Sequence, residues 1–471
     1  MRTGSGSAAR GRYNFQLMLI VMKFGGTSVG SPERIRALAE RVRERLARRP
    51  VVVVSAFSGV TDLLLRGAQL ALARDSDYEG IVADVLDRHR RAIHELLPPG
   101  PAQERLLAHV EATLSELRAL YTGVYHLAEL TARTLDAISG IGERLSYEVV
   151  AAALDTASLR TQAVDARGVI VTDETFGRAA PLMEETKAAA ARNVRPLVDA
   201  QVVPVLPGFI GSTKKGVATT LGRGGSDWSA AVVGAALGVE EIQIWTDVDG
   251  LMTVDPRVVA AARVIPEVSF DEAAELAYFG AKVLHPATIK PAVERGIPVR
   301  ILNSLNPGAP GTLIAGRLDG DERGEPRAIA FKKGIAVILI AQPRMLMAYG
   351  FVARVFEVFD RHRTPVDLIA TSEVSISLTV DDPHAVPAVE EELTRLGEVE
   401  VLREMAIVSV VGRGFSRHPG LAARVFQTLR EVNVVMISFG ASDVNFSFVV
   451  AQADAERAVR MLHHEFFEER R

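Results

Sequence analysis

Residues 207–230 read PGFIGSTKKGVATTLGRGGSDWSA, the densest run of glycine in the chain. Glycine lets the backbone adopt positive φ and approach an anion closely. Ser226 or Asp227 is predicted to cap a following helix, whose free N–H groups suit phosphate. Arg223 adds a planar guanidinium group that can bind a carboxylate or phosphate through two hydrogen bonds. The segment therefore predicts an anion-binding loop, with a plain glycine-rich hairpin as the alternative.

The composition of the chain excludes several classes of protein. Its 471 residues are 48% hydrophobic and 24% charged, with a formal net charge of −4. No sustained basic face supports nucleic-acid binding, and no apolar run reaches the roughly 18 residues of a membrane span. The absence of cysteine excludes disulfides and thiolate chemistry. We expect a cytoplasmic globular protein of several domains, with a disordered Gly/Ser/Arg-rich tail over residues 1–17.

The start of the globular part predicts a parallel sheet. Residues 17–26 (LMLIVMKFGG) and 51–62 (VVVVSAFSGVTD) are predicted to form buried strands that end in polar turns. Between them, residues 31–49 have the pattern of a helix that begins at Ser31 and Pro32. A strand, a helix and a strand in this order form a right-handed βαβ unit. Four side chains are predicted to share the apolar face of the helix: Ile35, Leu38, Val42 and Leu46.

Polar side chains follow both predicted strands. Open parallel sheets bind their ligands at the carboxyl ends of the strands. We expect six side chains to meet at this edge: Lys23, Thr27, Ser28, Ser55, Ser58 and Thr61.

Two other segments carry candidate acidic groups. Glu143 begins a helix predicted within residues 138–154, where a first-turn acid that answers the helix dipole is the simpler interpretation. The segment 241–257 is predicted to be a strand followed by two acidic turns, with Asp247, Asp249 and Asp255. These aspartates resemble oxygen ligands of Mg²⁺ or Ca²⁺, but their spacing fails the EF-hand pattern, and aspartate also favours turns.

The C-terminal third of the chain repeats itself. The charged, glycine-rich segment 316–327 is the best predicted domain boundary. Beyond it, residues 350–380 match residues 420–450 at an offset of 70, with nine of 31 positions identical. Each copy has the pattern strand, helix, strand, strand, helix, which is typical of a small α+β unit for binding or assembly.

The residues alone indicate a phosphotransferase or another anion-binding α/β enzyme. Neither G-x-x-x-x-G-K-[ST] nor G-x-G-x-x-G occurs in the chain. Phosphoryl transfer depends mainly on positioning and on positive charge around the transferred group, so another arrangement of glycine loops and lysine can serve.

Six motifs, in this order, resemble the aspartate kinase family: VMKFGGTSVGS, SAFSGVTDLL, ISGIGERLS, GFIGSTKKGVATTLGRGGSD, WTDVDGLMTVDPR and ELAYFGAKVLHP. The repeat resembles the ACT-domain pair of the same family. The resemblance implies an amino-acid-kinase fold, an open and mainly parallel sheet with helices on both faces, followed by two ferredoxin-like ACT domains. The expected boundaries are 18–315 for the catalytic domain, 316–330 for a linker, and 331–402 and 403–471 for two ACT domains that are either consecutive or interleaved.

The resemblance implies phosphorylation of the side-chain carboxylate of L-aspartate by ATP with Mg²⁺, giving 4-phospho-L-aspartate for lysine, threonine and methionine biosynthesis. Catalytic roles would fall to Lys23 and Asp227. The implied substrate-binding residues are Thr61, Glu143, Arg223 and Ser226. The implied ATP-binding residues are Lys23, Gly25, Gly26, Thr246, Asp247, Met252, Arg257 and Lys282, and no residue is assigned to a protein-held metal.

The first repeat copy is similar to the lysine-sensitive, single-function subclass, through MLMAYGFVARVF and TPVDLIATSEVSISLT. This similarity implies feedback inhibition by L-lysine and a homodimer formed through the ACT domains, with a tetramer as the larger alternative. In the second copy, Ile437 and Asp443 stand at the positions that correspond to Asp367 and Glu373, so this copy keeps one of the two acids. The implied effector site comprises Met345, Ala348, Phe351, Val352, Val366, Asp367, Ser372 and Glu373.

Three alternatives stay open at this point. Glutamate 5-kinase and acetylglutamate kinase are related enzymes, but they lack the tandem repeat. A catalytically inactive amino-acid sensor would not need Lys23, Arg223 and Asp227. Regulation by threonine, or by lysine and threonine together, is the alternative to lysine alone. A fused homoserine dehydrogenase is not expected, since no second catalytic block follows the repeat.

Overall fold

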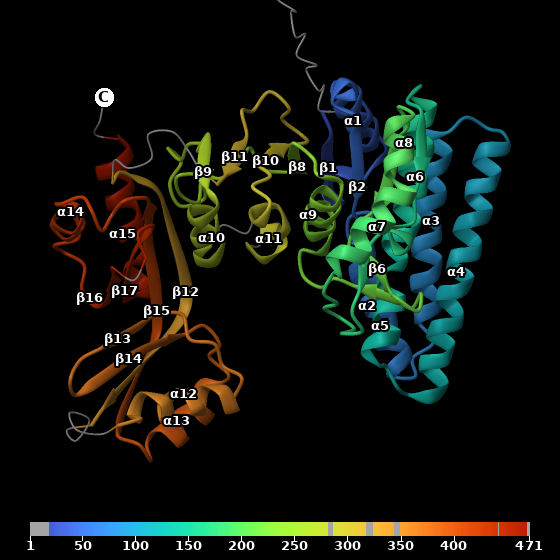
Figure 1. The fold of residues 1–471 in the computed structure, drawn as a ribbon. Coiled ribbons are helices and arrows are strands. Elements are labelled where there is room, and N and C mark those ends of the chain that lie inside the picture. Colours follow the sequence, from blue (N-terminus) through green and yellow to red (C-terminus); the bar gives the residue numbers. More distant parts are fainter. Residues whose placement is uncertain (1–17, 281–285, 317–323, 343–348, 441, 469–471) are drawn as a thin grey trace, which may run out of the picture. The chain divides into compact units, whose positions relative to one another are not determined.

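The computed structural model describes residues 18–280, 286–316, 324–342, 349–440 and 442–468 (Figure 1). The chain packs into two compact units, Met1–Gln243 and Ile244–Arg471, and the division falls within strand β8 (Glu241–Thr246). Among the helices of the described ranges, none combines the length and the apolar composition that a membrane span requires.

The first unit is built on parallel strands in the order β3-β5-β2-β1. Every residue of β1, β2 and β5 is buried, as expected for strands that are covered on both faces. The predicted parallel βαβ start is therefore confirmed. The strands are β1 (Ile20–Phe24), β2 (Pro50–Val54), β3 (Thr161–Ala163) and β5 (Val203–Pro207).

Helix α1 (Pro32–Arg43) begins where the sequence predicts. The Ser31 hydroxyl accepts a hydrogen bond from the backbone N–H of Arg34, and Pro32 occupies the first turn. The prediction for Leu46 was wrong, because α1 ends before it and Leu46 lies in a 3₁₀ turn (Leu46–Arg48) with 42% of its surface exposed. The 3₁₀ turn rotates the side chain off the buried stripe of α1.

The other helices of the first unit occupy the chain between and after these strands (Figure 1). They are α2 (Val60–Leu72), α3 (Tyr78–Leu96), α4 (Pro101–Leu127), α5 (Ala132–Ser139), α6 (Ile141–Thr156), α7 (Met183–Asn193), α8 (Arg195–Asp199) and α9 (Gly225–Leu237), with 3₁₀ turns at Gly26–Val29 and Ala166–Gly168.

The glycine-rich segment forms a small second sheet and then a helix. Strands β4 (Val171–Thr172), β6 (Ile210–Thr213) and β7 (Ala218–Thr220) make this sheet, and α9 follows. The cap position of α9 is Gly224, with φ of 71° and no side-chain hydrogen bond. The prediction that Ser226 or Asp227 caps the helix was therefore wrong. Glycine at Gly224 reaches a left-handed conformation without strain, which places Ser226 and Asp227 inside the first turn.

The second unit begins with a further α/β part. Strand β10 (Val299–Asn303) pairs antiparallel with β11 (Thr312–Ala315), and β11 pairs parallel with β9 (Glu267–Ser269). Helix α10 (Phe270–Phe279) starts with a complete capping box between Ser269 and Glu272. Helix α11 (Pro286–Glu294) precedes β10.

The repeat forms one six-stranded sheet in the order β13-β14-β12-β15-β17-β16. Both copies have the predicted order of strand, helix, strand, strand and helix. The first comprises β12 (Pro326–Ala341), α12 (Phe351–Arg361), β13 (Ile369–Thr371), β14 (Ser375–Val380) and α13 (Val386–Leu393). The second comprises β15 (Glu398–Gly412), α14 (Leu421–Thr428), β16 (Val434–Phe439), β17 (Asn445–Ala451) and α15 (Gln452–His463), followed by a π-helical turn (His464–Glu468).

The long strands β12 and β15 each serve both copies. The second half of β12 pairs with β14 and with the first half of β15. The first half of β12 pairs with the second half of β15, which also pairs with β17. Ile329, in that first half, is buried in the core of the second copy. The first half of β12 thus supplies a strand to the second copy.

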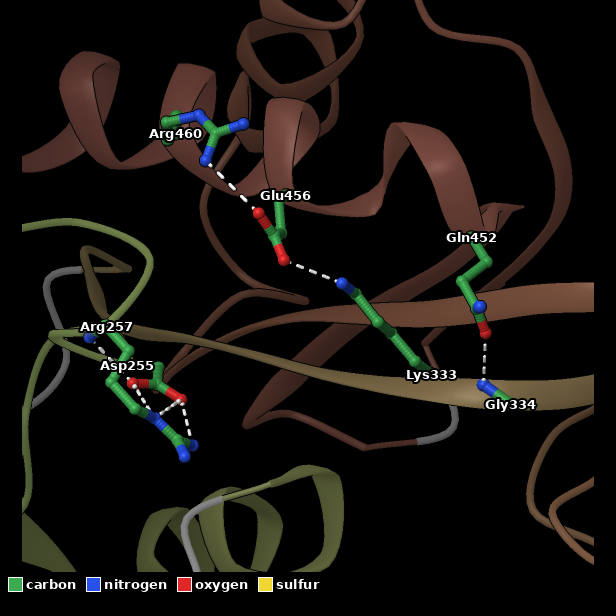
Figure 2. A network of polar contacts seen from close by, with 7 residues as sticks. All are labelled: Asp255, Arg257, Lys333, Gly334, Gln452, Glu456 and Arg460. Carbon is green, nitrogen blue, oxygen red and sulfur yellow. Dashed lines mark hydrogen bonds and ion pairs between the residues drawn. The ribbon is translucent and has the colours of Figure 1, made fainter.

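An irregularity in β12 separates its two halves. The register of the ladder shifts between Lys333 and Val337, and Gly334 has φ of 78°. Helix α15 holds this point, as Figure 2 shows: Lys333 Nζ lies 2.7 Å from Glu456 Oε1, and the Gly334 N–H donates to Gln452 Oε1 at 2.8 Å. Strand β12 begins at Pro326, inside the interval expected to be a linker, and the sequence-based domain boundaries stay predictions.

Candidate active site

The loops that follow β1, β2 and β5 meet at one edge of the parallel sheet. The N–H of Ser55 donates to the carbonyl of Phe24 at 3.1 Å, and the N–H of Gly208 donates to the carbonyl of Val54 at 2.8 Å. A Cβ on Gly26 would lie 3.1 Å from the carbonyl oxygen of Ala56, so the turn after β1 packs tightly against the turn after β2. The carboxyl edge of the sheet therefore gathers the polar loops of the first unit.

Lys23 and Asp227 form a buried ion pair at this edge. Lys23 Nζ lies 2.7 Å from Asp227 Oδ1, and the two side chains are 10% and 14% exposed. Lys23 stands next to the last residue of β1, whereas Asp227 lies in the first turn of α9. The geometry fixes one ammonium group beside a helix N-terminus, where both favour an anion.

Glu143 lies at the start of α6 and is only 4% exposed. Its Oε1 accepts a hydrogen bond from the N–H of Ala56 at 3.2 Å, while its buried Oε2 has no hydrogen-bond partner among the described residues. Burial raises the pKa of the Glu143 carboxyl to about 8. An ordinary first-turn acid would be exposed, so this environment favours a binding role for Glu143.

The glycine-rich loop packs closely on the turn between β5 and β6. A Cβ on Gly208 would lie 2.7 Å from the Cβ of Ser226, and one on Gly225 would lie 2.6 Å from the Phe209 ring. Phe209 itself has φ of 63°, which is uncommon for a residue with a side chain. Sequence reasoning missed Phe209, because a positive φ at a non-glycine residue leaves no pattern in the sequence.

Arg223 and Thr61 complete the predicted set in the first unit. Arg223 is exposed between Gly222 (φ of 78°) and Gly224 (φ of 71°), and no ion pair engages it within the described part of the chain. Thr61 is the second residue of α2, directly after the turn that follows β2. Gly25 precedes the 3₁₀ turn at Gly26–Val29 and accepts a backbone hydrogen bond from Ser28.

Five predicted ATP-binding residues lie in the second unit. Thr246 ends β8, and its hydroxyl donates to Asp247 at 3.2 Å. Met252 lies in a short bridge to Val264. Arg257 is 89% exposed and forms a two-pronged pair with Asp255 (Figure 2). Lys282 lies outside the described residues.

The acidic turns of the second unit are stabilised internally. Asp249 accepts hydrogen bonds from the side-chain amides of Asn303 at 2.7 Å and Asn306 at 3.1 Å. Asp255 accepts from the backbone and guanidinium of Arg257. Over the described ranges, no group of three or more histidine, aspartate or glutamate side chains could hold a metal ion. The turn-forming interpretation of Asp249 and Asp255 therefore fits their contacts.

The predicted effector residues lie around α12 and β13. Asp367 has a side chain only 2% exposed; its Oδ1 accepts from the hydroxyl of Tyr278 on α10, and its Oδ2 lies 3.6 Å from Lys332 Nζ. Burial raises the pKa of Asp367. Phe351 is buried in the core of the first copy, while Val352, Ser372 and Glu373 are exposed and Val366 is half-buried. Met345 and Ala348 fall in a part of the chain that is not described.

Two family models match the chain. The model of the amino acid kinase family matches residues 18–303, and the model of an ACT domain matches residues 343–391 and 408–466. Aspartokinase 1, chloroplastic, from Arabidopsis thaliana is 41% identical over 468 residues, which cover 95% of this chain and 80% of that protein.

Two solved structures of Escherichia coli aspartokinase III are also similar. One is its R-state complex with aspartate and ADP, with a TM-score of 0.80, and the other is its T-state complex with lysine and aspartate, with a TM-score of 0.81. Each is 36% identical in sequence and covers 96% of this chain and 100% of that chain. The chain therefore belongs to the aspartokinases, the members of the amino acid kinase family that phosphorylate aspartate and carry ACT regulatory domains.

Proposed function

We propose that the chain transfers the γ-phosphoryl group of ATP to the side-chain carboxylate of L-aspartate, with Lys23 and Asp227 as the catalytic pair. The observation that carries this assignment is their buried contact of 2.7 Å at the carboxyl edge of the sheet. Lys23 stabilises the charge of the transferring group, and Asp227 holds the ammonium in place. The ADP and aspartate in the relative's R-state complex support this choice of substrates.

Two charged residues would bind the ends of the amino acid. Arg223 binds the α-carboxylate, which its exposed guanidinium supports. Glu143 binds the α-ammonium, for which its buried Oε2, without a hydrogen-bond partner in the described part of the chain, is a suitable acceptor. Thr61 and Ser226 donate further hydrogen bonds to the substrate.

The reaction requires no general base. The side-chain carboxyl of free aspartate has a pKa of about 3.9 and is already ionised at neutral pH. Repulsion between this carboxylate and the phosphates must be offset, and Lys23 and Arg223 contribute positive charge for this purpose.

Nucleotide binding would use both glycines of the first turn and the second-unit residues. Gly25 and Gly26 approach the phosphates through their backbone, and Thr246, Asp247, Met252, Arg257 and Lys282 contact the rest of ATP. Kinases hold Mg²⁺ through substrate phosphates and one or two carboxylates, so the ion would arrive with ATP. Such an ion supplies further positive charge at the phosphates.

For regulation, we propose that L-lysine inhibits the enzyme at the first ACT copy, in a homodimer formed through the ACT domains. The buried carboxylate of Asp367 supports a cationic ligand, and Lys332 already presents an ammonium group to it. The relative's T-state complex contains lysine. The other residues of the site are those predicted from the sequence, from Met345 to Glu373.

The first experiment measures ATP-dependent aspartyl hydroxamate formation with L-aspartate, with and without millimolar L-lysine. We expect activity that lysine abolishes. Activity that does not change with lysine but falls with threonine would contradict lysine as the effector and leave aspartate as the substrate. Turnover with glutamate in place of aspartate would overturn the substrate itself.

A further inference from the structure

A buried carboxylate outside the proposed site anchors the loop that carries Arg223. Asp136, on α5, is 3% exposed. Its oxygens accept hydrogen bonds from the N–H of Thr220 at 3.0 Å, the hydroxyl of Thr220 at 2.6 Å and the N–H of Gly177 at 2.9 Å. Hydrogen bonds to an ionised acceptor are stronger and more directional than neutral ones. Asp136 therefore fixes two separate backbone segments.

Both segments border the glycine-rich loop. Thr220 is the last residue of β7 and stands three positions before Arg223. A Cβ on Gly222 would lie 3.0 Å from the carbonyl oxygen of Gly177, and the N–H of Ala179 donates to the carbonyl of Thr220 at 2.9 Å. The loop with Arg223 thus packs against the turn at Gly177, and Asp136 accepts hydrogen bonds from the backbone of both segments.

We propose that Asp136 is a positioning residue, which holds the loop of Arg223 so that the guanidinium meets the α-carboxylate of aspartate. The inference rests on the proposed role of Arg223. Arg223 has no ion pair of its own in the described part of the chain, so the backbone on either side of it determines where its guanidinium can reach.

The test compares D136N with T219V in the full-length enzyme. D136N keeps the size of the side chain but replaces one acceptor by an NH₂ group that faces backbone N–H donors. We expect the KM for aspartate to rise about tenfold, because small displacements of positioning groups have large effects, while the KM for ATP stays within about twofold. With saturating aspartate, kcat should stay close to that of the parent enzyme.

T219V is the matched control. Thr219 is equally buried and lies beside Thr220 on β7, and among the described residues its hydroxyl contacts the Thr172 hydroxyl, at 2.8 Å. Both variants should lower the melting temperature, but T219V should leave both KM values unchanged. A rise in the KM for aspartate in T219V as well would mean that any damage to β7 has this effect, and would overturn the specific role of Asp136.

Two further variants separate the possible failures. R223A should raise the KM for aspartate; if it does not, the proposed role of Arg223 fails. If R223A raises this KM and D136N does not, Arg223 keeps its role and the inference about Asp136 is wrong. If D136N does not fold, T220V takes its place, because it removes one donor and keeps the backbone bonds. We then expect a rise of about threefold in the KM for aspartate, and an unchanged KM would overturn the inference.

Discussion

Lys23 and Asp227 place two opposite charges in a site with little access to water. The side chains of Lys23 and Asp227 are 10% and 14% exposed, and Lys23 Nζ lies 2.7 Å from Asp227 Oδ1. Removing one partner of a buried pair leaves the other charge uncompensated, which costs about 3–5 kcal/mol. At this position, the stability of the fold and the proposed catalysis therefore depend on the same contact.

For K23M we expect kcat to fall about 10³-fold, because the transferring phosphoryl group loses its fixed positive charge. The free energy of unfolding should also fall, because Asp227 stays buried and unpaired. The double variant K23M/D227N removes both charges, so it should recover stability without recovering activity. Steady-state kinetics and urea unfolding measure the two effects, and substantial activity in K23M would contradict the role of Lys23.

The raised pKa of Glu143 gives a pH dependence with a defined sign. Its value of about 8, against a reference of 4.5, means that the free enzyme holds a proton there at neutral pH. An ammonium ligand needs the carboxylate, so binding releases this proton. The KM for aspartate should therefore fall by up to about tenfold per pH unit between pH 6 and 8, and level off above.

E143Q should bind aspartate weakly and lack this pH dependence. The same group affects folding in the opposite direction: between pH 4.5 and about 8 the folded chain binds more protons than the unfolded chain. Its contribution to the free energy of unfolding therefore decreases as the pH rises through this window. A KM for aspartate that does not change with pH in the parent enzyme would reject the proposed ionisation.

At the scale of elements, helix α10 contacts the proposed effector site. Tyr278, near its end, donates a hydrogen bond to Asp367, and Lys332 of β12 lies 5.2 Å from the centre of the Tyr278 ring. Lys332 also pairs with Asp381 at 2.5 Å. An effector ammonium must compete with these internal partners for the carboxylate of Asp367.

For Y278F we expect the half-inhibitory lysine concentration to fall about tenfold, which corresponds to about 1.4 kcal/mol. Asp367 loses one internal partner, so the ligand-free state is stabilised less. Activity without lysine should not change, because Tyr278 belongs to no proposed catalytic or substrate contact. D367N is the companion variant and should lose inhibition. An unchanged lysine response in Y278F would show that its hydrogen bond does not oppose the ligand.

At the scale of the second unit, the segment that carries predicted ATP contacts is part of an ACT core. Val254 and Val259 are buried in the same cluster as α14, α15 and the second half of β15. His463 of α15 is fully buried between Thr253 Oγ1, 3.1 Å from its Nε2, and Glu468 Oε1, 2.7 Å from its Nδ1. The second ACT copy thus supports the segment around Met252 and Arg257.

H463A should lower the melting temperature and raise the KM for ATP roughly fivefold, which is about 1 kcal/mol. The KM for aspartate should not change, because its proposed ligands lie in the first unit. H464A, at the exposed neighbouring position, is the control. An unchanged KM for ATP in a destabilised H463A would show that His463 supports the fold but not the nucleotide segment.

Much of the site could be predicted because its residues stand in local motifs. Lys23 stands next to the last residue of the buried strand β1, and Arg223 lies between two glycines, so their positions in the sequence imply the carboxyl edge of a sheet and a loop. The cap of α9 could not be predicted, since Gly224, Ser226 and Asp227 are all acceptable at that position. In the structure Gly224 is the cap, and Asp227 contacts Lys23. Asp136 and Phe209 were missed because neither belongs to a local pattern.

By itself, the sequence determined the parallel sheet, the glycine-rich loop and the tandem repeat, because each follows from periodicity and turn chemistry over short stretches. The tertiary structure decided what depends on residues far apart in the chain. It buried Glu143 and so raised the pKa of this carboxyl. It brought Asp136 within hydrogen-bond distance of Thr220 and Gly177, and it paired the first half of β12 with a strand of the second repeat copy. Burial, long-range hydrogen bonds and strand register arise only when distant segments pack, so no local pattern records them.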